Sequence, residues 1–172
     1  MTNPRGFTIF FAVLTASLAL AIGLAIYDLL VRELELSQTA KESQYAIYAA
    51  DTGAECALYW DLHYGTINSS DIDGSAFATS SAQTDKASAA EALCAGQDIT
   101  NNTVLSFPWT IQTSGPTTTT TFKIASSTAA GPCATITIEK AGDPPATTIT
   151  SRGYNTCFPS VLQLERALEI NY

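Results

Sequence analysis

Histidine and basic side chains are scarce in this chain of 172 residues. It has one histidine, His63, and eight Lys and Arg against sixteen Asp and Glu, so its formal net charge is -8. Nucleic acids and anionic membrane surfaces are bound by clustered Lys and Arg, so the charge balance argues against both kinds of partner. A single imidazole also leaves few ways to build a metal site or an acid–base pair.

The motifs of the common catalytic sites are missing as well. The chain has no Gly-x-Ser-x-Gly for a serine nucleophile, no glycine-rich phosphate loop and no Cys-x-x-Cys pair. His63 follows directly on a predicted helix, where the helix dipole favours such a residue, and this role suits it better than that of a general base. We therefore do not expect an enzyme.

The low charge of the chain is concentrated near its N-terminal end. Charged residues make up 14% of the chain, whereas about 25% is usual in soluble domains, and 24 Thr and 15 Ser supply polar surface instead. The 21 residues from Phe7 to Tyr27 carry no charge. A helix of this length spans roughly 30 Å, the thickness of a bilayer core. The sequence therefore predicts a transmembrane helix half over residues 7–30.

A cleaved secretory signal is the alternative for this segment. Its apolar region would measure about 7–15 residues and end at a cleavage site, but here the run is longer and leads into more helix. Asp28 to Leu62 contain no proline and one glycine, Gly53. We therefore expect one helix from Phe7 to about Leu62, roughly 80 Å long, with an amphipathic second half over residues 31–62. Residues at steps of four and seven predict its apolar face: Leu36, Ala40, Ile47, Ala54 and Leu58.

The start of the helix resembles a known processing signal. Residues 4–9 read Pro-Arg-Gly-Phe-Thr-Ile, and a short basic leader followed by Gly and an apolar run resembles the class III signal of type IV pilins and pseudopilins. The resemblance implies that a prepilin peptidase removes the leader, residues 1–6, between Gly6 and Phe7 and methylates Phe7. It also implies three further partners: other pilin subunits, the inner-membrane assembly platform and the lipid bilayer.

One position departs from the pattern of major pilins. The fifth residue of the mature chain is usually Glu in that family and is thought to neutralise the N-terminal ammonium of a neighbouring subunit; here it is Phe11. A buried ammonium without a partner costs several kcal/mol. Phe11 therefore suits a subunit with none above it, as in K-type minor pseudopilins and some PilX-like minor pilins. A major subunit in a lineage that tolerates Phe here stays open.

The rest of the helix supports the same resemblance. Glu33-Leu34-Glu35 and Ala49-Ala50-Asp51 resemble the N-terminal helix of PilX-like proteins, so that the likeness covers about residues 4–60. Small side chains in the apolar half permit close contact between membrane helices. The residues expected to serve in the assembly helix are Phe7, Phe11, Gly23 and Asp28.

The composition changes after Leu62. Residues 63–102 are rich in Gly, Ser, Asp and Asn and predict a loop region of the αβ type, in which Ala87–Leu93 suit a short helix. Residues 103–172 are rich in β-branched side chains and predict a small antiparallel sheet against the helix, so the expected fold class is α+β. The last segment, Leu162–Ile170, also suits a helix. We prefer a strand, because the pilin architecture that the chain resembles ends in its sheet. The expected strands are Val104–Gln112, Thr118–Ala125, Ala134–Lys140, Thr147–Arg152 and Leu162–Ile170.

The four cysteines predict disulfides, because an even number in an exported head is typical of them. Three pairings are possible. Cys133 and Cys157 bracket a predicted hairpin and would lie close at its open end, which leaves Cys56 on the helix to hold Cys94 and the loop. A zinc site is the rival, but the spacing that it needs is absent.

Two features of the loops remain open. Asp71 and Asp73, followed by Gly74, begin like a calcium loop, but the later ligands of an EF-hand are missing and a solvated turn is the alternative. Calcium is thus the only cofactor considered, because some pseudopilins bind it in loops of the head. Asn68 and Asn101 match the glycosylation signal by a pattern that chance also produces in a Ser- and Thr-rich chain.

Together these features predict a minor type IV pilin or pseudopilin. Such a subunit is a single-pass membrane protein with its head outside the cytoplasm, and it then assembles through its helix into a pilus or pseudopilus at the cell surface. The alternative is a single-span surface or adhesion protein that is neither cleaved nor assembled. A membrane-tethered hydrolase fits the residue inventory least.

Overall fold

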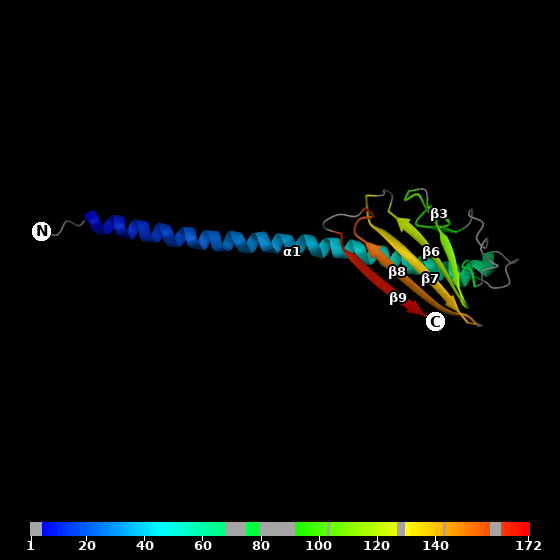
Figure 1. Ribbon diagram of the computed structural model, residues 1–172. Helices are drawn as coiled ribbons and strands as arrows, with labels where there is room; N and C mark the ends of the chain where they lie inside the picture. Colours follow the sequence, from blue (N-terminus) through cyan, green and yellow to red (C-terminus); the bar gives the residue numbers. More distant parts are fainter. Residues whose placement is uncertain are drawn as a thin grey trace. The chain divides into compact units, whose positions relative to one another are not determined.

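A computed structural model of the protein describes residues 5–67, 75–79, 92–102, 104–126, 130–142, 144–158 and 163–172. The chain divides into two units, Met1–Lys41 and Glu42–Tyr172. It contains one long helix, α1 (Arg5–Ile67), and antiparallel sheets, so the predicted α+β class is confirmed (Figure 1). The helix contains no proline, and it ends at Ile67 rather than at Leu62.

The second unit, residues 42–172, is built on a five-stranded antiparallel meander. The strands follow one another in the order β5-β6-β7-β8-β9, each paired with its neighbour in the chain. Tight turns connect β5 to β6 and β7 to β8, and Gly115 (φ 61°) and Gly142 (φ 89°) supply the left-handed backbone that these turns need. The strands are β5 (Thr110–Ser114), β6 (Thr117–Ala125), β7 (Cys133–Ala141), β8 (Ala146–Tyr154) and β9 (Glu165–Asn171).

The last four predicted strands are present, with small shifts of their ends. The final segment is the strand β9 and not a helix; it begins at Glu165, and Leu162 lies outside the described residues. The predicted strand Val104–Gln112 is wrong in its first part, because residues 104–106 form a turn with Ser106 at a φ of 50°. Short ladders precede β5, and they pair β1 (Leu93–Cys94) with β2 (Gln97–Asp98) and β3 (Asn101–Asn102) with β4 (Phe107–Pro108).

These ladders also bear on the expected loop region 63–102. Of the predicted helix Ala87–Leu93, Leu93 belongs to β1, and residues 87–91 lie outside the part that the structure describes. The backbone amide of Ile99 donates to the carbonyl of Ala92 at 3.0 Å, and that of Trp109 donates to the carbonyl of Thr100 at 2.9 Å. The segment is therefore partly paired rather than open loop.

In the three central strands, side chains alternate between the two faces of the sheet, apart from two adjacent buried residues at the end of β6 and at the start of β7. In β6 every second residue is buried, and the same alternation follows in β7 and β8. One face carries the apolar core, whereas the other carries mainly hydroxyl side chains, including a row in which Thr121, Thr137 and Thr150 lie opposite one another on adjacent strands. The largest buried side chains of the core are Phe77, Ile99, Phe122, Ile136, Ile138 and Ile149.

Within this second unit, α1 lies across the apolar face of the sheet, and the contact is unusually close (Figure 1). A Cβ atom placed on Gly153 would lie 2.0 Å from the carbonyl oxygen of Ala46 and 2.3 Å from the amide nitrogen of Ala50. A Cβ on Gly53 would lie 2.6 Å from Oγ of Ser151. Only residues without a bulky side chain fit at this seam.

This closeness corrects the predicted apolar face of the helix. Leu36 is 70% exposed and Ile47 is 44% exposed, and of the five predicted residues only Ala54 is buried. The buried face is instead made by small side chains, because larger ones would hold the helix away from the sheet. Its members are Ala46, Ala50, Gly53, Ala54 and Ala57, continued by Trp60.

Candidate functional site

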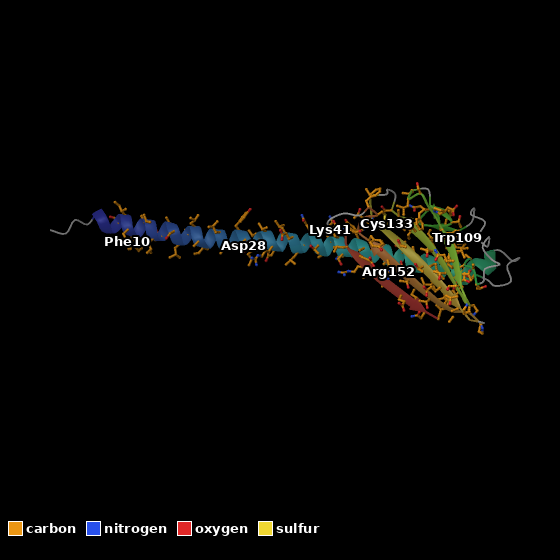
Figure 2. The ribbon with its side chains drawn as sticks, in the orientation of Figure 1. Phe10, Asp28, Lys41, Trp109, Cys133 and Arg152 are labelled. Atoms are coloured by element: carbon orange, nitrogen blue, oxygen red, sulfur yellow. A yellow bond between two sulfur atoms is a disulfide. The ribbon has the colours of Figure 1, made fainter. Side chains whose placement is uncertain are left out.

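In the first unit, residues 1–41, the apolar surface of α1 is exposed. From residue 8 to residue 30 every side chain is exposed, and Figure 2 shows Phe10 and Asp28 pointing away from the helix axis. Phe11, at the position singled out by the resemblance, is 57% exposed. Among the described residues, this is the one helix long and apolar enough to cross a membrane, by length and composition. Large exposed apolar side chains include Ile9, Phe10, Val13, Leu20, Leu24 and Leu29.

The polar side chains of this segment are satisfied inside the helix. The hydroxyl of Thr15 donates to the carbonyl oxygens of Phe11 and Ala12 at 3.1 and 3.0 Å, and that of Ser17 donates to Leu14 at 2.9 Å. A hydroxyl bonded to its own helix can enter an apolar medium at little cost, because no polar group is left without a partner. Thr15 and Ser17 therefore do not interrupt the apolar surface.

Two predicted assembly residues have distinct surroundings. No atom comes within 4 Å of a Cβ built on Gly23, so this position is open to close approach by another helix. Asp28, the first acidic residue after the apolar run, pairs with Arg32 one turn later at 3.2 Å. This exposed i,i+4 pair neutralises itself where the apolar run ends. Gly6 and Phe7 lie in the first turn of α1.

In the second unit, a buried polar cluster fixes α1 to the sheet. Asp61 of α1 is 6% exposed, and its Oδ1 lies 2.6 Å from Nζ of Lys140 in β7. The hydroxyls of Ser75 and Tyr172 donate to the two oxygens of the same carboxylate. Lys140 also donates to Oγ1 of Thr147 in β8 at 3.3 Å. The carboxylate thus connects α1 to β7, to a loop and to the residue that follows β9, and Lys140 extends the cluster to β8.

The phenol of Tyr172 is perturbed by this cluster. Partial burial raises the pKa of Tyr172 well above its ordinary value, and the hydrogen bond to the Asp61 carboxylate and the negative charge of that carboxylate raise it further. The hydrogen bond with Thr147 acts in the opposite direction. Tyr172 is thereby held as a neutral donor to Asp61.

The four cysteines form two disulfides. Cys56 of α1 is joined to Cys94, with 5.9 Å between the Cα atoms, and Cys133 is joined to Cys157, with 5.5 Å between the Cα atoms. This is the pairing that the hairpin argument favours. The first bond ties the segment of β1 to the helix, and the second ties the start of β7 to the segment after β8. In the chain-entropy account, loops of these lengths stabilise the fold by about 3–4 kcal/mol each.

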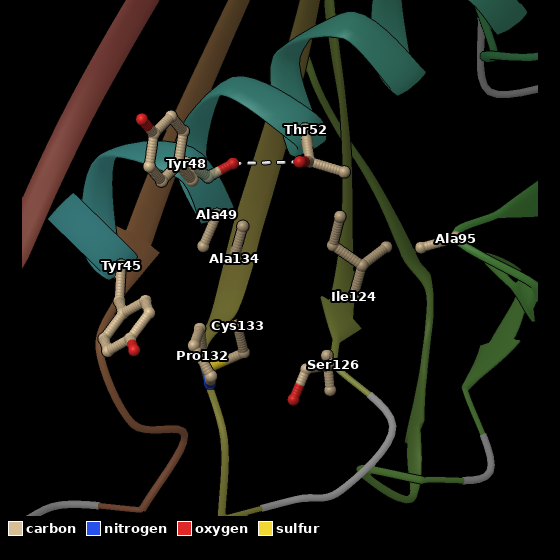
Figure 3. Close-up of a pocket in the computed structure, with 11 residues that line it drawn as sticks. Tyr45, Tyr48, Ala49, Thr52, Ala95, Ile124, Ser126, Pro132, Cys133 and Ala134 are labelled. Atoms are coloured by element: carbon tan, nitrogen blue, oxygen red, sulfur yellow. Dashed lines mark hydrogen bonds between the residues drawn. The ribbon is translucent and has the colours of Figure 1, made fainter.

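An apolar cavity of about 240 Å³ lies beside α1 in the second unit (Figure 3). Tyr45 and Tyr48 enter its lining from the helix, Ile124 from β6 and Ala134 from β7. Figure 3 also shows the hydroxyl of Thr52 donating to the carbonyl of Tyr48, at 2.9 Å. Of the side chains that line this cavity, only the two tyrosines can titrate, so it offers packing surface rather than chemistry.

The remaining residues singled out in the sequence are the calcium candidates, the glycosylation candidates and His63. The calcium candidates Asp71 and Asp73 and the glycosylation candidate Asn68 lie outside the described residues. Asn101 belongs to β3. Within the described ranges, no group of three or more His, Cys, Asp or Glu side chains is placed to hold a metal ion. His63 lies inside α1, where its ring stacks on that of Tyr59 with 4.8 Å between centroids.

The buried pair of Asp61 and Lys140 is the feature that the sequence reading missed. A signal was present, because Lys140 occupies the inward position of a strand whose alternation places Ile136 and Ile138 in the core. A charged residue at an inward position implies a buried partner.

No protein-family model, curated protein or solved structure matches the chain.

Proposed function

We propose that this protein is a minor type IV pilin or pseudopilin, a structural subunit that acts by assembly rather than by catalysis. One observation carries the proposal: an exposed apolar helix segment, residues 8–30, directly follows the Gly6-Phe7 junction of the processing signal. A surface so apolar is stable only in lipid or against other apolar helices. In a pilin the same surface serves first as a membrane anchor and then as the contact between subunits.

The proposal assigns a location to the helix and to the head, before and after assembly. Before assembly the subunit is a single-pass membrane protein whose head, residues 42–172, lies outside the cytoplasm, where its two disulfides are stable. Its partners are the prepilin peptidase, the assembly platform of the inner membrane and other pilin subunits. After assembly the head is displayed at the surface of the pilus or pseudopilus.

Phe11 supports a proposed position at the end of a filament. In an apolar filament core, a subunit above this one would bring an N-terminal ammonium near Phe11 and would find no carboxylate to neutralise it. From Arg5 to Tyr27 no acidic residue is present to substitute, and the first one, Asp28, already pairs with Arg32. A tip or initiating position avoids the unpaired charge.

Mass spectrometry of the mature chain tests the assignment to this family. The full chain is expressed in a host with a prepilin peptidase and recovered from its membranes. We expect an N-terminus at methylated Phe7, whereas Gly6→Val, which places a branched side chain at the cut, should retain the leader. Ser17→Val, a change of similar kind inside the helix, should be processed normally. A wild-type chain that begins at Met1 would refute the proposal and favour the unassembled single-span surface protein.

A further inference from the structure

The buried pair of Asp61 and Lys140 holds an amine against a carboxylate inside an apolar core. Nζ of Lys140 lies 2.6 Å from Oδ1 of Asp61, and the two side chains are 5% and 3% exposed. The inward neighbours of Lys140 on β7, Ile136 and Ile138, are buried as well. Both ions have lost their hydration in these surroundings. Transfer of one proton along the bond, from the ammonium to Oδ1, leaves a neutral amine beside a neutral carboxyl group.

The hydroxyls around Asp61 give its two oxygens different surroundings. Lys140 and Ser75 are bonded to Oδ1, whereas the phenol of Tyr172 donates to Oδ2. Once Oδ1 carries the proton, Oδ2 is the carbonyl oxygen. A donor at Oδ2 stabilises the negative charge that develops there when a nucleophile adds to Cγ. Partial burial and the bond to Asp61 raise the pKa of Tyr172, so the phenol keeps the proton with which it donates.

The amine of Lys140 is held in place from β8 as well. It donates to Oγ1 of Thr147 at 3.3 Å. On the other side of β7, Thr118 of β6 lies opposite Lys140 in the strand register, and its buried hydroxyl has no hydrogen-bond partner within the described part of the chain. This hydroxyl offers a polar group to a water molecule released at the pair. Because the amine and the carboxylate stand on a helix and a central strand, little entropy remains to be lost when they join.

We propose that Asp61 and Lys140 condense to form an amide crosslink between α1 and β7. The lone pair of the neutral Nζ attacks Cγ of Asp61, the bond from Nζ to Cγ forms, and the bond from Cγ to Oδ1 breaks. Two of the three hydrogens of the original ammonium leave with Oδ1 as water, and the third stays on the amide nitrogen. The step needs no oxidant, reductant or cofactor. The ion pair is the starting state, so freshly folded protein contains the pair and stored protein contains the amide.

The crosslink joins parts of the head that the disulfides leave separate. The bond of Cys56 and Cys94 ties α1 to β1, and the bond of Cys133 and Cys157 ties β7 to the segment after β8. Neither connects α1 to the five-stranded sheet, whereas the amide does. A covalent tie at this seam keeps the helix on the sheet when the head is pulled or exposed to denaturant. This inference concerns the head alone and does not rest on pilus assembly.

Mass spectrometry of the full chain, kept in detergent micelles and sampled over days, tests the proposal after reduction and alkylation of the cysteines. We expect the intact mass to fall by the mass of one water molecule. Trypsin should then release residues 42–86 joined to residues 124–152, because cleavage after Lys140 requires its free amine. The joined peptide distinguishes the crosslink from loss of water at Asp73-Gly74, which joins no peptides.

Three variants test the role of each group. Lys140→Arg keeps a cation opposite Asp61 but has no amine that condenses, so it should show neither the mass loss nor the joined peptide. Tyr172→Phe removes the donor at Oδ2 and should slow the mass loss by at least about tenfold. Tyr48→Phe changes an exposed phenol on α1 and should react at the wild-type rate.

A control without variants uses the wild-type chain unfolded in urea, which keeps every reacting group but not their geometry and should not form the joined peptide. Tryptophan fluorescence shows which samples are folded. The proposal is overturned if the folded wild-type chain keeps its full mass, or if it loses water without forming the joined peptide. It is equally overturned if the unfolded chain forms that peptide as fast as the folded one.

Discussion

The ammonium of Lys140 lies 2.6 Å from a carboxylate oxygen of Asp61, and the two side chains are only 5% and 3% exposed. Both charged groups lose their hydration when they are buried. Their mutual attraction and the hydrogen bonds from the hydroxyls around them offset this desolvation penalty. Because Asp61 belongs to α1 and Lys140 to β7, the pair holds the helix on the sheet. It acts together with the close packing at Gly153 and the disulfide of Cys56 and Cys94.

Breaking this pair from one side should be strongly destabilising. Lys140→Met leaves the carboxylate buried without its cation, and we expect the free energy of unfolding to fall by about 3–5 kcal/mol. The double variant Asp61→Asn with Lys140→Met should lose clearly less than the sum of the two single variants, because neither charge is then left alone. Urea unfolding followed by the fluorescence of Trp60 and Trp109 reports on the head only.

The exposed ion pair of Arg152 and Glu165 serves as the control for the Asp61 and Lys140 variants. Arg152 bonds to Glu165 at 2.8 Å in water-accessible surroundings, so Arg152→Met should leave the urea midpoint almost unchanged. Equal losses for Arg152→Met and Lys140→Met would contradict the special role of the buried pair.

Stability of the head should fall at alkaline pH, and Tyr172 should account for part of the fall. Its pKa is raised in the folded protein above the ordinary value of about 10, so above that pH the unfolded chain releases a proton that the folded chain keeps. The stabilisation by Tyr172 is complete below about pH 10 and is lost as the pH rises toward its folded pKa.

Tyr172→Phe should therefore flatten the decline of unfolding free energy above pH 10, measured by urea unfolding at a series of pH values. Tyr48→Phe, which changes a phenol that is exposed on α1, should keep the wild-type slope. Identical slopes for wild type and Tyr172→Phe would show that Tyr172 does not account for the loss of stability at alkaline pH.

The fold was largely predictable from local patterns, and the seam between helix and sheet was not. Charge-free and proline-free runs predicted α1, and β-branched runs with Gly-containing turns predicted β6, β7 and β8. The buried face of the helix was misplaced because hydrophobicity favoured Leu36 and Ile47, whereas packing against Gly153 selects for size. The partner of Lys140 could not be found, since alternation shows that a charge points inward but not which distant residue it meets.

Gly153 should tolerate no side chain. In Gly153→Ala the new methyl group would meet the helix backbone at Ala46 and Ala50. Backbone atoms inside a helix cannot move aside as a flexible side chain can. We expect a loss of about 3 kcal/mol or more. Gly53→Ala meets the side chains of Ser151 and Ile136, which can adjust in part, so its loss should be smaller, about 1–3 kcal/mol.

Urea midpoints from tryptophan fluorescence rank these variants. Gly23→Ala is the matched control, because a Cβ there meets nothing within 4 Å, and it should leave the stability of the head unchanged. A Gly153→Ala head as stable as wild type would mean that α1 lies farther from the sheet than the structure places it.

Phe11→Glu tests the terminal position proposed for this subunit. In the mature chain the new carboxylate would neutralise the ammonium of Phe7 on a subunit above, and the variant could then be incorporated within the filament. We expect label on the head, confined to filament ends in wild type, to appear along the filament, and the copy number relative to the major subunit to rise. Immunogold microscopy and quantitative mass spectrometry of sheared filaments measure these two quantities.

Two further variants show whether position or charge decides the outcome. Phe11→Leu removes the aromatic ring without adding charge and should keep the terminal location. Leu14→Glu places the same carboxylate about one turn further along α1, away from the expected ammonium, and should reduce membrane insertion or incorporation rather than extend it. If Phe11→Glu leaves both label position and copy number as in wild type, the absence of a carboxylate at this position does not restrict the subunit to the end of the filament.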